Sequence, residues 1–231
     1  KRILDGLSLS DAGDLTHRAS CSPVDFFSAV EARIYALSRA ARVPLCIGGD
    51  HSITLPAVRG VARAIGPVQI VQLDAHHDDT PVEAGSLPTH SNFVSFLLHI
   101  PQVLKVVQVG VRGYSSIPPR AHGKLHRCTP SQVCGLLDPA VPVYLTIDSD
   151  AFDPSFLPAV RHPMPLGLSL SDLDVVLDAV QTSNARVVGV DWTEYDPDLD
   201  QANYQSAQFI LFGLLRTLAC IERQQVPSKF L

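Results

Sequence analysis

The sequence has few charged residues and no long apolar stretch, and each shortage excludes a class of protein. Only 18% of the 231 residues are charged, and the 18 lysines and arginines are scattered. The basic patch that binds nucleic acid or a membrane surface is therefore missing. No run of about 20 apolar residues occurs, so we expect no transmembrane helix. The opening stretch (1–15) lacks the apolar core of a signal peptide, which predicts a cytoplasmic protein.

Cysteine is scarce as well. The five cysteines are odd in number, lie far apart and form no Cys-x-x-Cys pair. This usage is not that of a disulfide framework. We expect five reduced thiols that serve as small packing residues.

What the sequence does have is enough apolar material for one large domain, with a regular alternation of patterns. Hydrophobic residues make up 46% of the chain, which fits a single domain over 1–231. The predicted strands are 43–47, 68–73, 104–111, 141–147 and 185–192, and the predicted helices are 25–41, 53–65, 91–99, 130–137, 171–182 and 204–222. Alternating strands and helices predict an α/β fold with three αβα layers and a mainly parallel sheet.

Three polar clusters follow predicted strands. They read IGGDHS (47–52), LDAHHDD (73–79) and IDSDAFDP (147–154). The carboxyl ends of parallel strands meet at one edge of the sheet, which is where open α/β proteins bind ligands. We therefore expect the three clusters to form one site.

Alternation along an extended chain selects residues within two of these clusters. Side chains two positions apart share a face, so Asp74, His76 and Asp78 point one way, and Asp148 and Asp150 also share a face. His77 and Asp79 point the opposite way and are left out. The candidate metal ligands are then His51, Asp74, His76, Asp78, Asp148 and Asp150.

The charge of this set indicates metal binding. Four carboxylates and two neutral imidazoles carry a formal charge of −4, which two divalent cations would balance. An oxygen-rich set without a thiolate suits Mn²⁺ better than Zn²⁺. A solvated acidic loop would explain one cluster, but three at successive strand ends favour a metal centre.

The same residues resemble the ureohydrolase family, which includes arginase and agmatinase. GGDHS, DAHHD and DSDAFDP each match a signature segment of that family, and GGDHSITLP is similar to the agmatinase version. The likeness runs from 10–15 to 191–200 and on through the last predicted helix. It implies an arginase-like fold, a guanidino substrate, release of urea and an amine, and a homotrimer or homohexamer.

The resemblance also implies how two Mn²⁺ ions would be held. One ion would be bound by His51, Asp74, Asp78 and Asp148, and the other by His76, Asp74, Asp148 and Asp150. Asp74 and Asp148 would bridge the ions, and a hydroxide shared between the metals would attack the guanidinium carbon.

Further roles follow from the same likeness. His90 matches a histidine that moves protons, Asp78 would orient the hydroxide, and Glu194 matches a glutamate that pairs with the guanidinium. Ser86 is added to the substrate-binding set. Asp191, in the same segment as Glu194, is expected to be structural.

The sequence departs from the family pattern where the substrate would enter. Ser91 replaces a glycine, and RHP (161–163) replaces Gly-Thr-Pro, which sets Arg161 and His162 near the mouth of the site. An arginine there would attract an anion and repel a polyamine, unless it turns outward to solvent.

Several functions stay open at this point. The first is an agmatinase-like or arginase-like hydrolase. The alternatives are a formimidoylglutamate-type enzyme that uses Arg161, an Asp-His-His phosphoesterase, and a metal-bearing homologue that binds a guanidino ligand without catalysis. The phosphoesterases lack partners for GGDHS and DSDAFDP.

The last departure concerns the amino-terminal part of the domain. Family members carry a further segment with a first strand, and nothing in this sequence matches it. Since the first residue is Lys1, either the sequence begins late or the sheet has lost a strand, and both readings are expectations.

Overall fold

The fold is built on a six-stranded sheet in which every pairing is parallel. The computed structural model describes residues 6–16, 21–83, 85–114, 121–200 and 203–225. The strands are β1 (Leu45–Ile47), β2 (Val68–Leu73), β3 (Val103–Val109), β4 (Leu125–Cys128), β5 (Val143–Asp148) and β6 (Val187–Thr193). Their order across the sheet is β1-β6-β5-β2-β3-β4, so β2 and β5 lie at its centre.

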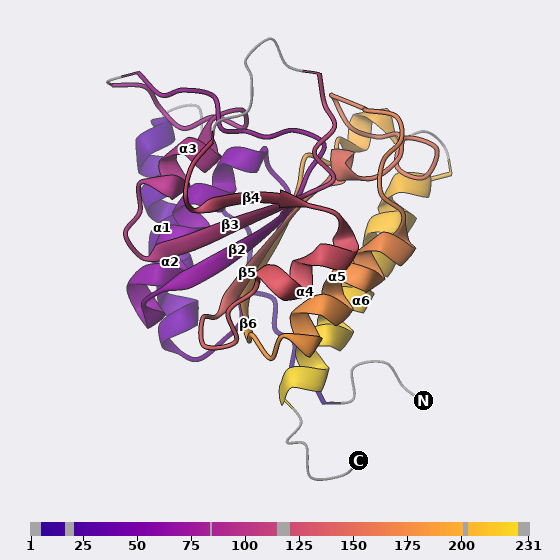
Figure 1. Cartoon of the computed structure of the whole chain (residues 1–231). Coiled ribbons are helices and arrows are strands. Elements are labelled where there is room, and N and C mark those ends of the chain that lie inside the picture. The colour runs from indigo at the N-terminus through magenta and orange to yellow at the C-terminus, as the bar shows by residue number, and fades with distance from the viewer. Residues whose placement is uncertain (1–5, 17–20, 84, 115–120, 201–202, 226–231) are drawn as a thin grey trace.

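Helices cover both faces of the sheet, as Figure 1 shows. One face carries α1 (Pro23–Arg39), α2 (Thr54–Ile65) and α3 (Phe93–Leu98), and the other carries α4 (Val133–Leu136), α5 (Leu170–Thr182) and α6 (Gln205–Gln225). Each face has its own apolar core. The predicted three-layer α/β architecture is confirmed.

Alternation along the central strand explains why there are two cores. Val68 and Ile70 of β2 pack on the side of α1 and α2, while Val71 and Leu73 pack on the side of α5 and α6. Successive side chains of a strand point to opposite faces, so a strand covered on both sides is apolar throughout. The polar glutamines of β2 are therefore exceptions that require hydrogen bonds.

Helix starts follow the expected local chemistry. Ser22 precedes α1, accepts the Asp25 N–H and is followed by proline at the first helical position. Ser169 and Asp172 form a reciprocal capping box at the start of α5. Each cap stabilises its helix by about 1 kcal/mol.

The sequence-based prediction omitted one strand and made one helix too long. β4 is only four residues long and none of them is buried, so it lacks the apolar run that identified the other strands. The helix predicted over 130–137 is a single turn (Pro130–Gln132) followed by the short α4.

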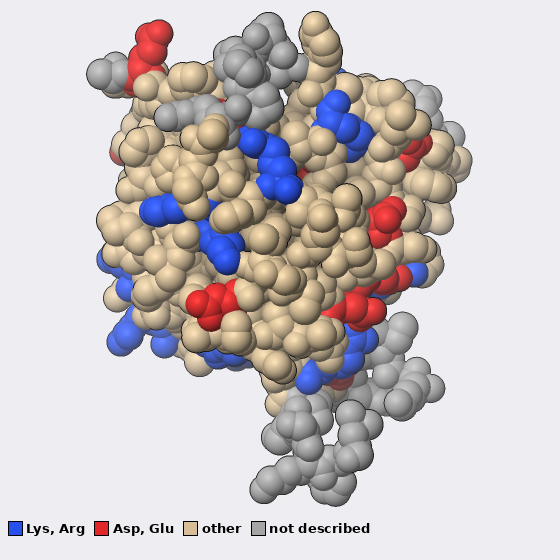
Figure 2. Space-filling model, in the orientation of Figure 1, with Lys and Arg blue, Asp and Glu red and all other residues tan. Residues whose placement is uncertain are grey.

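The surface shows no large charged field on the face seen in Figure 2, where basic and acidic side chains form small separate groups. Within the described ranges, no helix combines the length and the apolar character that a bilayer span requires.

Candidate metal centre

His51 lies at the centre of the site, just beyond the carboxyl end of β1. Gly48 and Gly49 have φ of 89° and 84°, a conformation that glycine adopts without steric cost, and they turn the chain away from the strand. Asp50 then accepts the Ser52 N–H and begins a short 3-10 turn (His51–Ile53). The turn carries the His51 side chain into the interior, where it is fully buried.

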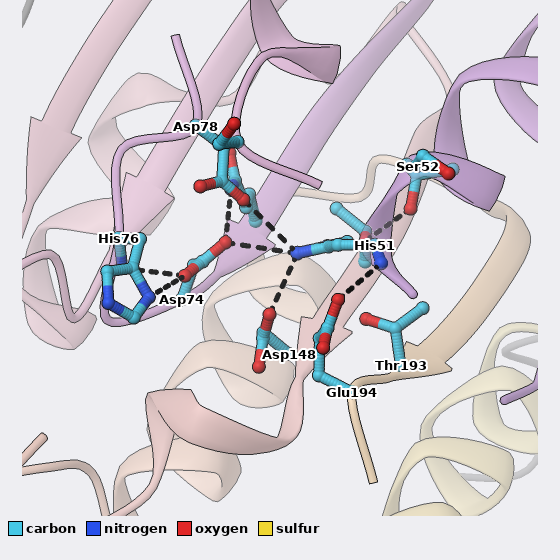
Figure 3. A network of polar contacts seen from close by, with 12 residues as sticks. His51, Ser52, Asp74, His76, Asp78, Asp148, Thr193 and Glu194 are labelled. Atoms are coloured by element: carbon cyan, nitrogen blue, oxygen red, sulfur yellow. Dashed lines mark hydrogen bonds and ion pairs between the residues drawn. The ribbon is translucent and has the colours of Figure 1, made fainter. Parts of the chain in front are cut away.

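Three carboxylates surround the Nδ1 atom of His51 (Figure 3). The nearest oxygens of Asp148, Asp74 and Asp78 lie at 3.0, 3.1 and 3.6 Å. They come from the ends of β5 and β2, so the parallel sheet brings together segments far apart in sequence. Asp78 has φ of 47°, a left-handed conformation that asparagine and aspartate tolerate best among residues other than glycine.

A second group forms around His76. Its Nδ1 lies 3.0 Å from Asp150 Oδ2 and 3.7 Å from Asp74 Oδ1. Asp74 belongs to both groups, because its Oδ2 faces His51 and its Oδ1 faces His76. Sets of ligand atoms close enough to share an ion are His51, Asp74 and Asp78 in one case, and Asp74, His76 and Asp150 in the other.

The expected alternation of Asp148 and Asp150 along an extended strand is wrong in its local geometry. β5 ends at Asp148, whose side chain accepts the Asp150 N–H at 2.7 Å and starts a 3-10 turn (Ser149–Ala151). Asp150 still reaches the site, but it does so from this turn and on the His76 side. Aspartate competes with the sheet for nearby backbone donors, which is why the strand stops there.

A hydrogen-bond chain behind His51 fixes the orientation of its ring. His51 Nε2 lies 2.7 Å from Thr146 Oγ1, and Thr146 donates to Asp191 at 2.6 Å. Tyr144 donates to the other Asp191 oxygen at 2.7 Å, an approach possible because a Cβ on Gly189 would lie 2.5 Å from the tyrosine ring. Asp191 therefore supports the histidine from behind, in keeping with the structural role expected for it.

The carboxylates of the site favour positive charge on the histidines between them. For His51, burial lowers the pKa, but the negative charge of the adjacent Asp148 and Asp74 carboxylates outweighs it, and the net pKa is well above its usual value. Hydrogen bonds with Asp150 and Asp74 raise the pKa of His76 to about 11. Burial raises the pKa of Asp78, and Asp74 adds to the rise. In Asp148, burial and then Asp150 raise the pKa.

The residues present fit a bound cation. His51 Nδ1 is buried, yet none of the surrounding carboxylates makes a hydrogen bond of good geometry with it within the described residues. An imidazole nitrogen, which offers a lone pair once it loses its proton, amid three carboxylate oxygens is the donor set of a metal ligand site. The second nitrogen of His51 is held from behind, as is usual for a ligating histidine.

Glu194 lies beside His51 rather than in a separate place. Its Oε1 accepts the His51 backbone N–H at 2.7 Å (Figure 3), and its own φ is 61°. Burial raises its pKa. A residue held in a sparsely populated conformation at a site is a common sign of a functional role.

The predicted histidines form a row that leads away from the centre. His162 lies edge-on to His76 with ring centroids 6.2 Å apart, and it stacks with His90 at 5.8 Å. His162 is thus on the His76 side of the centre, and both His162 and His90 are exposed. Ser86 is exposed, and no contact in the described part joins its side chain to the centre.

Arg161 does not present a free cation. Its Nη2 lies 2.7 Å from Asp196 Oδ2, and its side chain is 69% exposed. The sequence left open whether Arg161 faces the site or turns outward to solvent. In the structure its guanidinium turns outward. An ion pair so exposed is worth little, about 0–1 kcal/mol.

His77 and Asp79, which alternation placed outside the site, contact each other. His77 Nδ1 lies 2.5 Å from Asp79 Oδ1, and Arg127 Nη2 lies 2.8 Å from the other Asp79 oxygen. The two adjacent histidines of DAHHD therefore contact different carboxylates: His76 faces Asp150 and Asp74, and His77 faces Asp79.

The sequence predicts no role for Arg112, because the residues around it in the sequence do not have the spacing of metal ligands. Its guanidinium donates to the carbonyl oxygens of Asp150, Ala151, Met164 and Pro165 at 2.7–3.0 Å. It thereby ties the turn that carries a candidate ligand to the loop that carries His162. Such a role depends on contacts between distant segments, which no local pattern encodes.

Two cavities adjoin these residues. A small one of about 120 Å³ is lined by His76, Asp78 and Ser91, among others. A much larger one of about 1360 Å³ runs along β1 and α1, and it includes His90 but none of the six candidate ligands. We take the smaller cavity to mark the approach to the centre, because it touches candidate ligands and the larger one does not.

The comparisons with known proteins agree with this geometry. The Arginase family model matches residues 1–215. The chain is 33% identical over 189 residues to Arginase 1, mitochondrial, from Arabidopsis thaliana, covering 76% of this chain and 54% of the relative. It is 31% identical over 224 residues to Proclavaminate amidinohydrolase from Streptomyces clavuligerus, covering 87% of this chain and 69% of the relative.

Solved structures give the same result. The Proclavaminate amidinohydrolase structure superimposes with a TM-score of 0.78 at 26% identity, covering 93% of this chain and 76% of that one. A putative agmatinase from Clostridium difficile shares the fold with a TM-score of 0.81 at 23% identity, covering 96% and 82%. The chain spans about half to two thirds of the length of the curated relatives it matches. By sequence and fold, this chain belongs to the Arginase family.

Proposed function

We propose that this chain is a metal-dependent hydrolase of a guanidino compound that releases urea and an amine. The observation that carries the proposal is the shared position of Asp74, whose two oxygens face two different histidines. A carboxylate so placed suits a pair of ions close together. Relatives named arginase, agmatinase and proclavaminate amidinohydrolase support the substrate class.

Two Mn²⁺ ions are the proposed cofactor. The His51 group and the His76 group would hold one ion each, with Asp74 common to both and Asp148 the second bridging candidate. Oxygen-rich ligand sets with imidazole suit Mn²⁺. When bound, such a pair of ions makes a water molecule nucleophilic at neutral pH.

The chain's own residues would do the rest. Glu194 would bind and orient the guanidinium through its carboxylate, since charge-assisted hydrogen bonds of this kind are short and directional. Asp78 would orient the attacking water, which adds to the guanidinium carbon. His90 would carry a proton between solvent and the departing amine, whose C–N bond breaks as urea forms.

Arg161 bears on the choice of substrate. Its guanidinium pairs with Asp196 and is largely exposed, which weakens the argument for a formimidoylglutamate-type enzyme. A guanidino substrate without an obligatory carboxylate, such as agmatine, is the better candidate. The non-catalytic alternative is weakened by the complete set of six candidate ligands around one centre.

The test is turnover by the purified chain with Mn²⁺ added, measured as urea release from agmatine and arginine and as formamide release from formimidoylglutamate. We expect urea from a guanidino substrate and none after treatment with a chelator. Replacing Arg161 with glycine should leave the ratio of rates for acidic and basic substrates almost unchanged. Tight binding of a guanidino compound without turnover would support the non-catalytic alternative, and a large change in ratio would restore a role for Arg161.

We propose further that the chain acts in the cytoplasm as a homotrimer or homohexamer. Light scattering of the purified chain measures the assembly, and a monomer at micromolar concentration would contradict this part of the proposal.

A further inference from the structure

Two buried glutamines face each other behind the metal centre. Gln72 of β2 and Gln108 of β3 are register partners on neighbouring strands, and each has 0% exposure. Both lie in strands that are otherwise largely apolar. A buried amide is destabilising unless its hydrogen bonds are made, so the pair must serve a purpose that an apolar pair would not.

The amides form a directional chain that ends on the shared carboxylate. Gln108 Nε2 donates to the His77 carbonyl oxygen at 2.7 Å and to Gln72 Oε1 at 2.9 Å. Gln72 Nε2 donates to Asp74 Oδ2 at 2.6 Å. A carboxylate only accepts, so Gln72 must turn its NH₂ group toward Asp74. Its carbonyl oxygen then requires a donor, and Gln108 supplies it.

This arrangement is kept at a cost. With both Nε2 hydrogens of Gln108 donated, its Oε1 is buried and has no hydrogen-bond partner within the described residues. The opposite orientation of both amides would give that oxygen a donor from Gln72, but it would turn Gln108 Oε1 toward the His77 carbonyl and Gln72 Oε1 toward the Asp74 carboxylate. The chain therefore favours the donor on Asp74 over a fully satisfied Gln108.

The contact is specific to one half of the centre. Gln72 binds Oδ2, the Asp74 oxygen that lies 3.1 Å from His51 Nδ1. The other oxygen faces His76 and is already fixed by the His76 backbone N–H at 2.6 Å. Gln72 thus donates to the Asp74 oxygen on the His51 side.

We propose that Gln72, held in place by Gln108, is a positioning residue that orients Asp74 and sets the metal affinity of the His51 half of the centre. The inference rests on the metal-binding part of the proposed function and not on its substrate. A hydrogen bond to a ligating carboxylate fixes its rotation, and losing such a partner lowers metal affinity by roughly 10- to 100-fold.

The chain contains a matched control on the same strand. Gln69 of β2 is also buried, at 1% exposure, but its Nε2 donates to the carbonyl oxygens of Asp138 and Val141, away from the centre. Gln69→Met and Gln72→Met remove the same amide from the same strand. A merely structural role would make the two variants alike in metal binding.

The experiment is calorimetric titration of Mn²⁺ into the full metal-free chain at fixed pH, with melting temperatures measured on the same samples. We expect all the variants to melt lower than wild type. Gln72→Met should weaken one of the two Mn²⁺ binding steps by about 10- to 100-fold, and Gln108→Met should weaken the same step less. Gln69→Met should leave both steps unchanged. Gln108→Met keeps the Asp74 contact, so it remains informative if Gln72→Met does not fold.

The proposal is overturned if Gln72→Met binds Mn²⁺ as tightly as wild type, or if Gln69→Met weakens binding equally. If Gln72→Met does not fold, unchanged Mn²⁺ affinity in Gln108→Met overturns it. A wild-type chain that binds no Mn²⁺ would overturn it together with the proposed cofactor. A chain that binds Mn²⁺ but releases no urea would contradict the proposed function alone, since the affinities of the variants would still decide the role of Gln72.

Discussion

The backbone N–H of His51 donates a hydrogen bond of 2.7 Å to Glu194 Oε1. This bond joins the loop after β1 to the loop after β6, two neighbouring strands of the sheet. It leaves the second oxygen of Glu194 for another partner. The position of that carboxylate beside the candidate metal centre is the basis of the first prediction.

Replacing Glu194 with glutamine should weaken substrate binding without removing metal. The variant keeps an acceptor for the His51 N–H but loses the charge that attracts a guanidinium. Losing one charge-assisted contact costs about 1.5–3 kcal/mol, which is roughly a ten- to hundredfold fall in kcat/KM. Steady-state kinetics and metal analysis check this. Glu31→Gln on α1, whose carboxylate pairs with Arg63, should leave both measurements unchanged, and metal loss in Glu194→Gln would contradict the assignment.

Replacing Asp74 with asparagine should cost more metal than replacing Asp78. Asp74 faces both histidines, whereas Asp78 lies near His51 only. We expect Asp74→Asn to retain well under one ion per chain and Asp78→Asn to retain about one. Elemental analysis after gel filtration measures the content. Equal retention in the two variants would show that Asp74 is not shared.

Metal binding should release protons. In the metal-free chain, hydrogen bonds with Asp150 and Asp74 raise the pKa of His76 to about 11, and carboxylates raise that of His51 despite burial. The His76 imidazole is therefore protonated at pH 7.5 and must become neutral to bind metal. The apparent affinity should rise with pH. Calorimetry in two buffers with different ionisation enthalpies detects the released protons, and identical enthalpies in both would contradict the prediction.

Replacing His90 with alanine should slow turnover but spare metal binding. His90 is exposed and stacks on His162 rather than on the centre, so it would act on proton transfer. The expected loss in kcat is about 100-fold, at the lower end for a group that moves protons. Partial recovery in imidazole buffer would identify the missing proton carrier. His99→Ala, at the other end of α3, is the control, and an equal loss there would point to a change in packing.

Much of the fold was readable from the sequence because the signal was local. Strands covered on both faces are largely apolar, as in VQIVQL of β2, and helices such as α1 and α5 begin with caps, Ser22 and Ser169. β4 escaped prediction because an edge strand with no fully buried residue has no such run.

The sequence by itself also determined which residues meet at the centre, since parallel strands bring their carboxyl ends to one edge and three of those ends carry carboxylates and histidines. Only the tertiary structure decided how they meet. In the structure Asp74 faces both histidines and Asp150 lies on a turn. Arg161 pairs with Asp196, and Gln72 donates a hydrogen bond to Asp74 from behind. Each of these depends on the direction of a side chain relative to a segment distant in sequence, and such directions arise from packing rather than from spacing along the chain.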